Sequence, residues 1–367
     1  MLNWLLICVP IVIGLEFFRP EAHSLIFLMS CLAIVPLAGW LGRATEHLAH
    51  HTGEAIGGLL NATLGNAAEL IIAIMALHRG LYAVVKASLT GSIIGNVLLV
   101  LGAAILAGGM KFQVQRFNAV AARTLSTLLT LAAIALVVPA AFHSIAGPGS
   151  KIRENSLSLE ISLVLLLAYG AHLFFSLYTH KRLLAGDASA GEVSGEDEPH
   201  TDEKPWSMRN AVLVLLGVTA LIAWVSEILT GSVEEAAKSF GMTSVFVGVI
   251  VVAVVGNAAE HSTAILMAMK NRMELAMQIA IGSSLQIALL VAPLLIILSR
   301  FIGPEPMDLV FTPAEVLAVF ASVMITGQVA SDGESNWLEG ILLLALYVIL
   351  GIVFYLLPDA PTEALVR

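Results

Sequence analysis

The sequence contains little charge and almost no cysteine. Only 12% of its 367 residues are Asp, Glu, Lys or Arg, whereas soluble domains hold about 25%. In contrast, 58% of the residues are hydrophobic, and the mean hydropathy is +0.91. This composition excludes an ordinary soluble domain and predicts an all-α membrane protein that crosses the bilayer many times. The two cysteines, Cys8 and Cys31, lie in apolar runs without metal-ligand spacing, which excludes a disulfide framework and a zinc knuckle.

The apolar runs predict about 11 transmembrane helices. The runs measure roughly 18 to 28 residues, which is the length that a helix needs to cross a bilayer. The first run, within 1–19, has no positively charged start and no small-residue cleavage site. We therefore expect a leading transmembrane helix that is retained, and not a signal peptide. The ten further spans are expected at 23–45, 54–78, 82–109, 118–142, 157–182, 208–230, 243–269, 273–302, 312–330 and 337–357.

These ten spans form two groups of five on either side of an acidic linker. We expect a first five-helix repeat at 20–185, a linker at 186–206 and a second five-helix repeat at 207–367. Because five is odd, the second repeat must enter the membrane from the opposite side, so the two repeats would be inverted. Inverted repeats are typical of secondary transporters, whose sites lie near the membrane midplane at the repeat interface.

The positive charges predict how the chain lies in the membrane. With a cytoplasmic N-terminus, slightly more than half of the 18 Lys and Arg residues lie in inside segments, which predicts a cytoplasmic N-terminus and an outside C-terminus. The acidic linker would then be cytoplasmic, either as a solvated connector or as a weak collector of Ca²⁺. The compact loops favour a prokaryotic plasma membrane. Nothing indicates nucleic acid as a partner, and the sequence leaves a homo-oligomer open.

One motif, Gly-Asn-Ala-Ala-Glu, occurs at 65–69 and again at 256–260. The same offset of 191 residues relates Gly91-Ser92 to Gly282-Ser283, so the chain contains an internal repeat. Each copy places one glutamate, Glu69 or Glu260, inside an apolar run. An acid in such a position indicates a functional site, because an ionised carboxylate is costly there without a partner.

Polar residues accompany each glutamate at matching positions. Their spacing predicts that Gly65, Asn66 and Glu69 share one face of a helix, and that Gly256, Asn257 and Glu260 do the same. The glycines also permit local unwinding, which can turn backbone carbonyls toward a cavity. The next helix of each repeat adds further polar groups, namely Ser92 and Asn96 in the first, and Ser283, Ser284 and Gln286 in the second.

These donors are oxygens, and His261 is the nitrogen nearby. Carboxylate and neutral oxygens suit a hard divalent cation, and Ca²⁺ suits them better than Mg²⁺. Two close carboxylates cannot both stay charged in an empty site, so either a metal cation held by Glu69 and Glu260 or protons must neutralise them. Such exclusive occupancy favours an exchanger of Ca²⁺ and H⁺ without enzymatic activity or cofactor.

Several other interpretations stay open at this point. The polar residues could serve helix packing, or the chain could be a cation channel. An intramembrane metalloenzyme is disfavoured because no His-Glu-x-x-His pattern is present. A second cluster could bind a transition metal, but its position at the end of a span favours a wet vestibule. Its members are Glu46, His47, His50, His51 and Glu54.

The motifs also resemble those of a known family. They read GNAAELI at 65–71 and SLTGSIIGN at 88–96 in the first repeat, and GNAAEH at 256–261 and GSSLQIAL at 282–289 in the second. They resemble the two repeat signatures of the calcium/proton antiporter (CAX) family of the calcium/cation exchanger superfamily. The acidic linker between the two five-helix halves extends the resemblance over the whole chain.

The resemblance implies roles for individual residues. Glu69 and Glu260 would carry the cation and the protons, with Asn66, Asn257, Ser92 and Ser283 as supporting ligands. Gln286 and His261 would mark the proton-coupled branch of the superfamily. The chain departs from the expected pattern at Gly95, where the resemblance predicts a serine. A sodium-coupled exchanger is the alternative, but the apolar Ala68 and Leu70 beside Glu69 argue against it.

Overall fold

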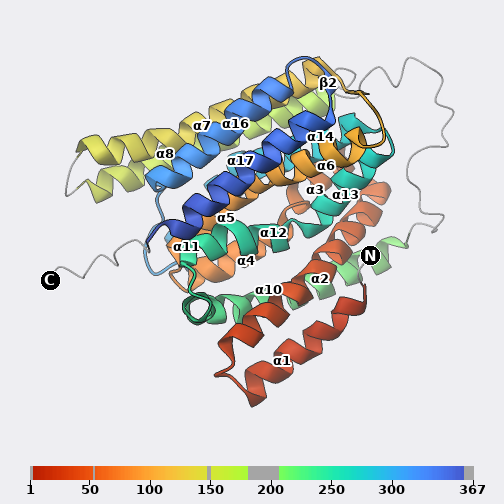
Figure 1. The fold of residues 1–367 in the computed structure, drawn as a ribbon. Coiled ribbons are helices and arrows are strands. Elements are labelled where there is room, and N and C mark those ends of the chain that lie inside the picture. Colours follow the sequence, from red (N-terminus) through yellow and green to blue (C-terminus); the bar gives the residue numbers. More distant parts are fainter. Residues whose placement is uncertain (1–2, 53, 147–149, 181–205, 359–367) are drawn as a thin grey trace.

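The computed structural model describes residues 3–52, 54–146, 150–180 and 206–358, and this part of the chain is mostly helical (Figure 1). The one sheet in the described residues pairs two short antiparallel strands, β1 (Gln115–Arg116) and β2 (Glu334–Ser335). The predicted all-α class is therefore confirmed. The linker expected at 186–206 lies outside the described residues except for Trp206.

The first repeat contains helices that are interrupted by short π-helical turns. The leading region holds η1 (Asn3–Ile7) and α1 (Cys8–Phe18). The first repeat holds α2 (His23–Thr52), α3 (Glu54–Leu64), α4 (Ala67–His78), α5 (Tyr82–Ile94), η2 (Gly95–Val100), α6 (Leu101–Gly109), α7 (Ala119–Ala146), α8 (Lys151–Phe174) and η3 (Phe175–Thr179).

The second repeat follows the same plan. It holds α10 (Met208–Ser239), α11 (Ser244–Phe246), η5 (Val247–Val252), α12 (Ala253–Gly256), α13 (Ala258–Met269), α14 (Met273–Gln286), η6 (Ile287–Val291), α15 (Ala292–Ile302), α16 (Pro313–Val329) and α17 (Trp337–Leu356).

Seven helices in the described residues are long and apolar enough to cross a membrane. A bent pair, Ser244–Gly256 with Ala258–Met269, makes an eighth candidate, and its two halves meet at 62°. Three shorter apolar helices lie at Asn3–Phe18, Ala67–His78 and Pro313–Val329. Each expected span corresponds to one of these helices or contains one, whereas the count of 11 crossings stays a prediction.

The two glutamate-bearing spans are broken at the repeated motif. The first ends at Leu64 and resumes at Ala67, and the second ends at Gly256 and resumes at Ala258. The prediction that glycine, asparagine and glutamate share one face of a continuous helix is therefore wrong. The predicted unwinding is confirmed, because Gly65 and Asn66 form a turn and Asn257 occupies the matching break.

The internal repeat extends to the turns and their hydrogen bonds. Gly80 and Asn271, which are 191 residues apart, both have a positive φ, of 74° and 60°. The amide of Gly80 donates to Leu77 O over 3.0 Å, and the amide of Asn271 donates to Ala268 O over the same distance. This αL turn favours glycine, or asparagine as the next best residue. The two repeats therefore end their glutamate helices in the same way.

The two repeats run in opposite directions. The hydroxyl of Tyr82, at the start of α5, donates to the carbonyl of Glu305, which follows the end of α15. At the other end, the amide of Gln115, which follows α6, donates to Ala268 O, close before the start of α14. The segment α5–α6 is thus antiparallel to α14–α15, as inverted repeats require.

The buried apolar residues form two clusters. Helices α1, α2 and α10 pack together and, with parts of α4, α5 and η5, form the smaller one. Figure 1 shows these three helices side by side at one edge of the molecule. The larger cluster joins α5, α6, α7, α14, α15, α16 and α17. Of the two glutamate helices, α4 contributes to both clusters and α13 contributes to the larger one.

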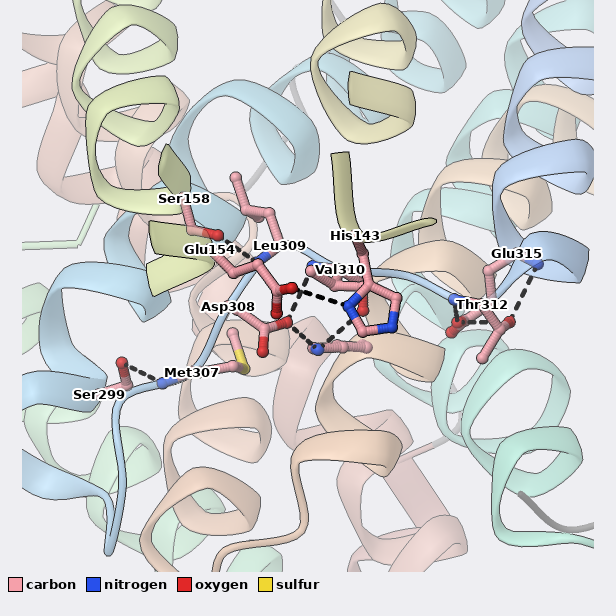
Figure 2. A network of polar contacts seen from close by, with 11 residues as sticks. His143, Glu154, Ser158, Ser299, Met307, Asp308, Leu309, Val310, Thr312 and Glu315 are labelled. Atoms are coloured by element: carbon pink, nitrogen blue, oxygen red, sulfur yellow. Dashed lines mark hydrogen bonds and ion pairs between the residues drawn. The ribbon is translucent and has the colours of Figure 1, made fainter. Parts of the chain in front are cut away.

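An extended segment closes the end of the bundle that carries Gly80. Residues 303–312 connect α15 to α16, and their side chains alternate, with Met307, Leu309 and Phe311 buried. The backbone amides of Met307 and Leu309 donate to the hydroxyls of Ser299 and Ser158, each over 2.9 Å (Figure 2). Three apolar side chains and two hydrogen bonds therefore hold this segment in the bundle.

Two ion pairs attach the same segment to other helices. Lys86 of α5 donates to Asp308 over 2.5 Å and to the carbonyl of Val310 over 2.9 Å. Lys151 pairs with Glu305 over 2.8 Å, and this hydrogen bond lowers the pKa of the Glu305 carboxyl. The Lys151 pair is exposed, whereas the side chains of Lys86 and Asp308 are only 16% and 22% exposed. The sequence analysis did not identify Lys86 or Asp308.

The Lys86–Asp308 pair yields a prediction on stability. Asp308→Asn leaves a partly buried ammonium without its carboxylate, so we expect the free energy of unfolding to fall by about 1 to 3 kcal/mol. The measurement is denaturant or thermal unfolding of the purified protein in detergent. The control is Glu334→Gln in the exposed pair with Arg116 at 3.1 Å, where we expect a loss below about 1 kcal/mol. Equal losses in both variants would contradict the prediction.

Candidate functional site

The two helix breaks meet α5 and α14 in the middle of the bundle. Asn66 and Asn257, one from each break, are buried, as are Ser92 of α5 and Ser283 of α14. The amide of Asn257 donates to Ser92 Oγ over 3.0 Å, and the hydroxyl of Ser283 lies 2.9 Å from Asn66 Oδ1. Because both residue pairs are related by the offset of 191, the structure makes the same contact twice, once in each direction.

Two amide side chains connect these contacts. The amide of Asn96 donates to Asn257 Oδ1 over 3.2 Å and to Ser283 Oγ over 3.1 Å. Gln286 Oε1 accepts a hydrogen bond from the amide of Asn66. The result is one buried polar network that joins both repeats and contains hydroxyl and amide groups.

Glu260 belongs directly to this network. Its Oε2 lies 2.5 Å from the hydroxyl of Ser283, which also faces Asn66 Oδ1. One hydroxyl hydrogen serves only one acceptor at a time. When that hydrogen goes to Asn66, the short contact between Glu260 and Ser283 needs a proton on the carboxyl or a cation between the oxygens.

Glu69 lies beside the helix break of the second repeat. A Cβ atom added to Gly256 would lie 3.1 Å from Glu69 Cγ, so the glycine makes room for the glutamate. Glu69 also lines a small cavity, large enough for about one water molecule, with Ser88 and Ser92 as its hydroxyl groups. The remaining lining is apolar and comprises Ile72, Ala73, Leu89, Val252, Ala253 and Ile287.

The two halves of the site are not identical. The position equivalent to Gln286 is Gly95, which has no side chain, and a Cβ added there would meet nothing within 4 Å. At Gly65 an added Cβ would lie 3.5 Å from Gln286 Oε1, whereas at Gly256 it would meet Glu69. The equivalent glycines Gly65 and Gly256 thus have different neighbours, the amide of Gln286 and the side chain of Glu69.

His261 lies half-buried next to Glu260, where the first repeat has Leu70. Its ring forms no hydrogen bond or ion pair within the described part of the chain.

The structure assembles most of the residues predicted from the sequence, and leaves two of them, His261 and Ser284, outside the hydrogen-bonded network. Ser284 lies next to Ser283, but its hydroxyl lies 3.3 Å from Ile93 O and 3.1 Å from Ala280 O, outside the network. Ser88 was missed as a site residue, although it stands one turn before Ser92. The residues that the structure brings together are Gly65, Asn66, Glu69, Ser92, Asn96, Gly256, Asn257, Glu260, Ser283 and Gln286.

The histidine-rich end of α2 makes contacts of another kind. The ring of His47 stacks on Trp206 at 4.4 Å, and His51 Nε2 lies 2.7 Å from Trp206 O. In the described residues, no three His, Cys, Asp or Glu side chains gather as a metal site. A cation at the central site would therefore have two carboxylates, with hydroxyl and amide oxygens as its other ligands.

Comparison with known proteins identifies the family. The family model of the sodium/calcium exchanger protein matches residues 23–178 and 210–356. The chain is 46% identical over 342 residues to the Ca²⁺/H⁺ antiporter of Aphanothece halophytica, which covers 92% of this chain and 91% of that protein. It is 46% identical over 347 residues to the Ca²⁺/H⁺ antiporter ChaA of Bacillus subtilis, covering 94% and 95%. A vacuolar calcium ion transporter of Schizosaccharomyces pombe is 38% identical over 360 residues, covering 97% and 85%.

Solved structures support the same assignment. The structure of native YfkE is 42% identical, has a TM-score of 0.78, and covers 96% of this chain and 100% of its own. The H⁺/Ca²⁺ exchanger CAX has a TM-score of 0.69 at 16% identity, covering 95% and 90%, and at that identity the likeness shows the fold alone. The resemblance to calcium/proton antiporters that the motifs predicted is confirmed. The chain belongs to the sodium/calcium exchanger protein family.

Proposed function

We propose that this protein exchanges Ca²⁺ for H⁺ across a membrane by alternating access, with Glu69 and Glu260 as the shared binding groups. The observation that carries the proposal is the lack of a fixed counter-charge. Within the described residues, neither glutamate forms an ion pair with Lys or Arg. Both side chains are half-buried in apolar membrane spans, where an ionised carboxylate without a partner is costly, so a mobile cation or a proton must neutralise each of them.

The geometry around Ser283 supports proton and cation as alternatives. When Ser283 donates to Asn66, Glu260 can approach Ser283 at 2.5 Å only as a donor, which requires a protonated carboxyl. When Glu260 is ionised, a cation can take the place of that proton and bind the same oxygens. Both occupants use one site, so each excludes the other, and exclusion at one site is the condition for exchange.

The ligand set supports Ca²⁺ as the cation. Two carboxylates with surrounding hydroxyl and amide oxygens can supply the six to eight ligands that Ca²⁺ takes. Mg²⁺ releases its water reluctantly and suits such an all-protein set less well. A sodium-coupled exchange is the alternative, but Ala68 and Leu70 beside Glu69 add no further oxygen ligands. The names of the bacterial relatives, Ca²⁺/H⁺ antiporters, favour the proton-coupled reaction.

The proposal extends to the setting of the reaction. The protein is an integral membrane transporter without enzymatic activity or bound cofactor, in the plasma membrane of a prokaryote. Its N-terminus lies in the cytoplasm and its C-terminus outside. The test is Ca²⁺ flux into sealed vesicles under an imposed pH gradient. Uptake that is driven by the pH gradient and whose rate does not change with Na⁺ supports the proposal. Flux that does not depend on the gradient would indicate a channel.

The pair of glutamates yields a prediction on transport. We expect Glu69→Gln and Glu260→Gln each to abolish exchange, because each removes half of the charge that balances a divalent ion. Flux in vesicles and gel-filtration profiles in detergent measure activity and folding separately. Glu235→Gln, at an exposed residue that pairs with Lys238, is the control and should exchange normally. Near-normal Ca²⁺ flux in either site variant would contradict the proposal that both glutamates bind the transported cation.

The neighbouring serines Ser283 and Ser284 yield a prediction on Ca²⁺ affinity. Ser283→Ala removes a hydroxyl that contacts Glu260, so we expect the apparent KM for Ca²⁺ to rise about tenfold or more. Ser284→Ala removes a hydroxyl that lies near backbone carbonyls outside the network, and its KM should stay close to that of the wild type. A larger effect at Ser284 than at Ser283 would contradict this arrangement of the site.

A further inference from the structure

Helix α3 of the first repeat packs differently from η5, its equivalent in the second repeat. η5 packs along α5, and two glycines form the contact. A Cβ on Gly91 of α5 would overlap the carbonyl of Val249, and a Cβ on Gly248 would lie 2.6 Å from Ala87 Cβ. Only glycine permits this close approach of the two backbones. We call this contact the closed seam.

The contact that is equivalent by the internal repeat would join α3 to α14. The offset of 191 relates Gly91 to Gly282, and it relates Gly248 and Val249 to Gly57 and Gly58. The sequence thus has glycines at the positions that a second seam would need. We call this set, Gly57 and Gly58 with Gly282, the open seam.

The open seam is not packed in this structure. A Cβ on Gly282 would meet nothing within 4 Å, whereas one on Gly91 would collide with backbone. Helix α3 instead packs on α2, so that Gly57 lies against Ala49 O and Gly58 against the side chain of Leu177. Glycine in a helix interior is destabilising relative to alanine. Gly282 therefore carries a cost that no contact in this structure explains.

Side chains along the two seams differ in the same sense. Asn61 and Thr263, on the side of the open seam, are exposed. Their equivalents at the closed seam are Val252 and Ile72, which are both buried. These positions are thus polar and accessible beside the open seam, and apolar and buried beside the closed seam.

We propose that α3 closes on α14 by bringing Gly57 and Gly58 against Gly282, and that the closed seam opens when this happens. The two seams are then alternately packed, and each closure shuts one path to Glu69 and Glu260. This inference rests on the proposed exchange by alternating access, and it assigns Gly282 as a positioning residue for the state that the structure does not show.

A single methyl group tests the proposal. Gly282→Ala fits the open space of this structure, so we expect Ca²⁺ binding to the purified protein within about twofold of the wild type and exchange in vesicles at least about tenfold slower. Gly170→Ala is the matched control, since Gly170 is a helical glycine of α8 with equally open space, and its exchange should be normal. Wild-type exchange by Gly282→Ala would overturn the proposal.

Cross-linking gives an independent result if Gly282→Ala does not fold. With Cys8 and Cys31 replaced by alanine, a cysteine pair at Gly58 and Gly282 should form a disulfide in membranes under a Ca²⁺ and pH gradient, and the disulfide should stop exchange. A pair at Gly170 and Gly282 is the control and should not cross-link. The absence of any Gly58–Gly282 cross-link, with or without the gradient, would overturn the proposal. If the wild type itself shows no Ca²⁺/H⁺ exchange, the proposed function fails and not the seam alone.

Discussion

The structure depends on two carboxylates that lie in the apolar interior without a permanent cation. Glu69 and Glu260 each follow a helix break at the start of α4 and α13, and no Lys or Arg of the described chain pairs with them. The energetic cost of two such acids has to be met by whatever enters the site. The buried network of Asn66, Asn257 and Ser283 contacts Glu260 through the serine hydroxyl, but its neutral groups cannot neutralise either acid. The site therefore requires an occupant, and Ca²⁺ and H⁺ are the two occupants that its oxygens suit.

Inversion of the repeats lets one short motif build a complete site. Each Gly-Asn break gives its asparagine to a serine of the other repeat, over 3.0 Å in one direction and 2.9 Å in the other. A break in a membrane helix leaves backbone groups without partners, and such a break is tolerated where it lines a site. A break that would destabilise an ordinary membrane span thus forms the binding centre, and each repeat contributes one such break.

The differences between the repeats matter as much as their likeness. Gln286 has no counterpart at Gly95. In addition, η5 packs tightly on α5, whereas α3 does not pack against Gly282 of α14. If the two repeats packed identically, the site would be accessible from both sides of the membrane or from neither. Alternating access requires that the path from one side is open while the path from the other side is closed. The different packing of the two glycine seams corresponds to that difference.

The sequence by itself determined the helical class, the internal repeat and the polar residues of the site. Run length, composition and a constant offset are local or periodic properties, and burial in a bilayer leaves helices as almost the only choice. Only the tertiary structure decided that the motif breaks its helix, and that Ser283 rather than Ser284 faces Glu260. It also decided that Lys86 pairs with Asp308, more than two hundred residues away in the chain, and which half of the molecule is open. These features depend on contacts between distant segments, and the spacing of residues along one segment does not contain them.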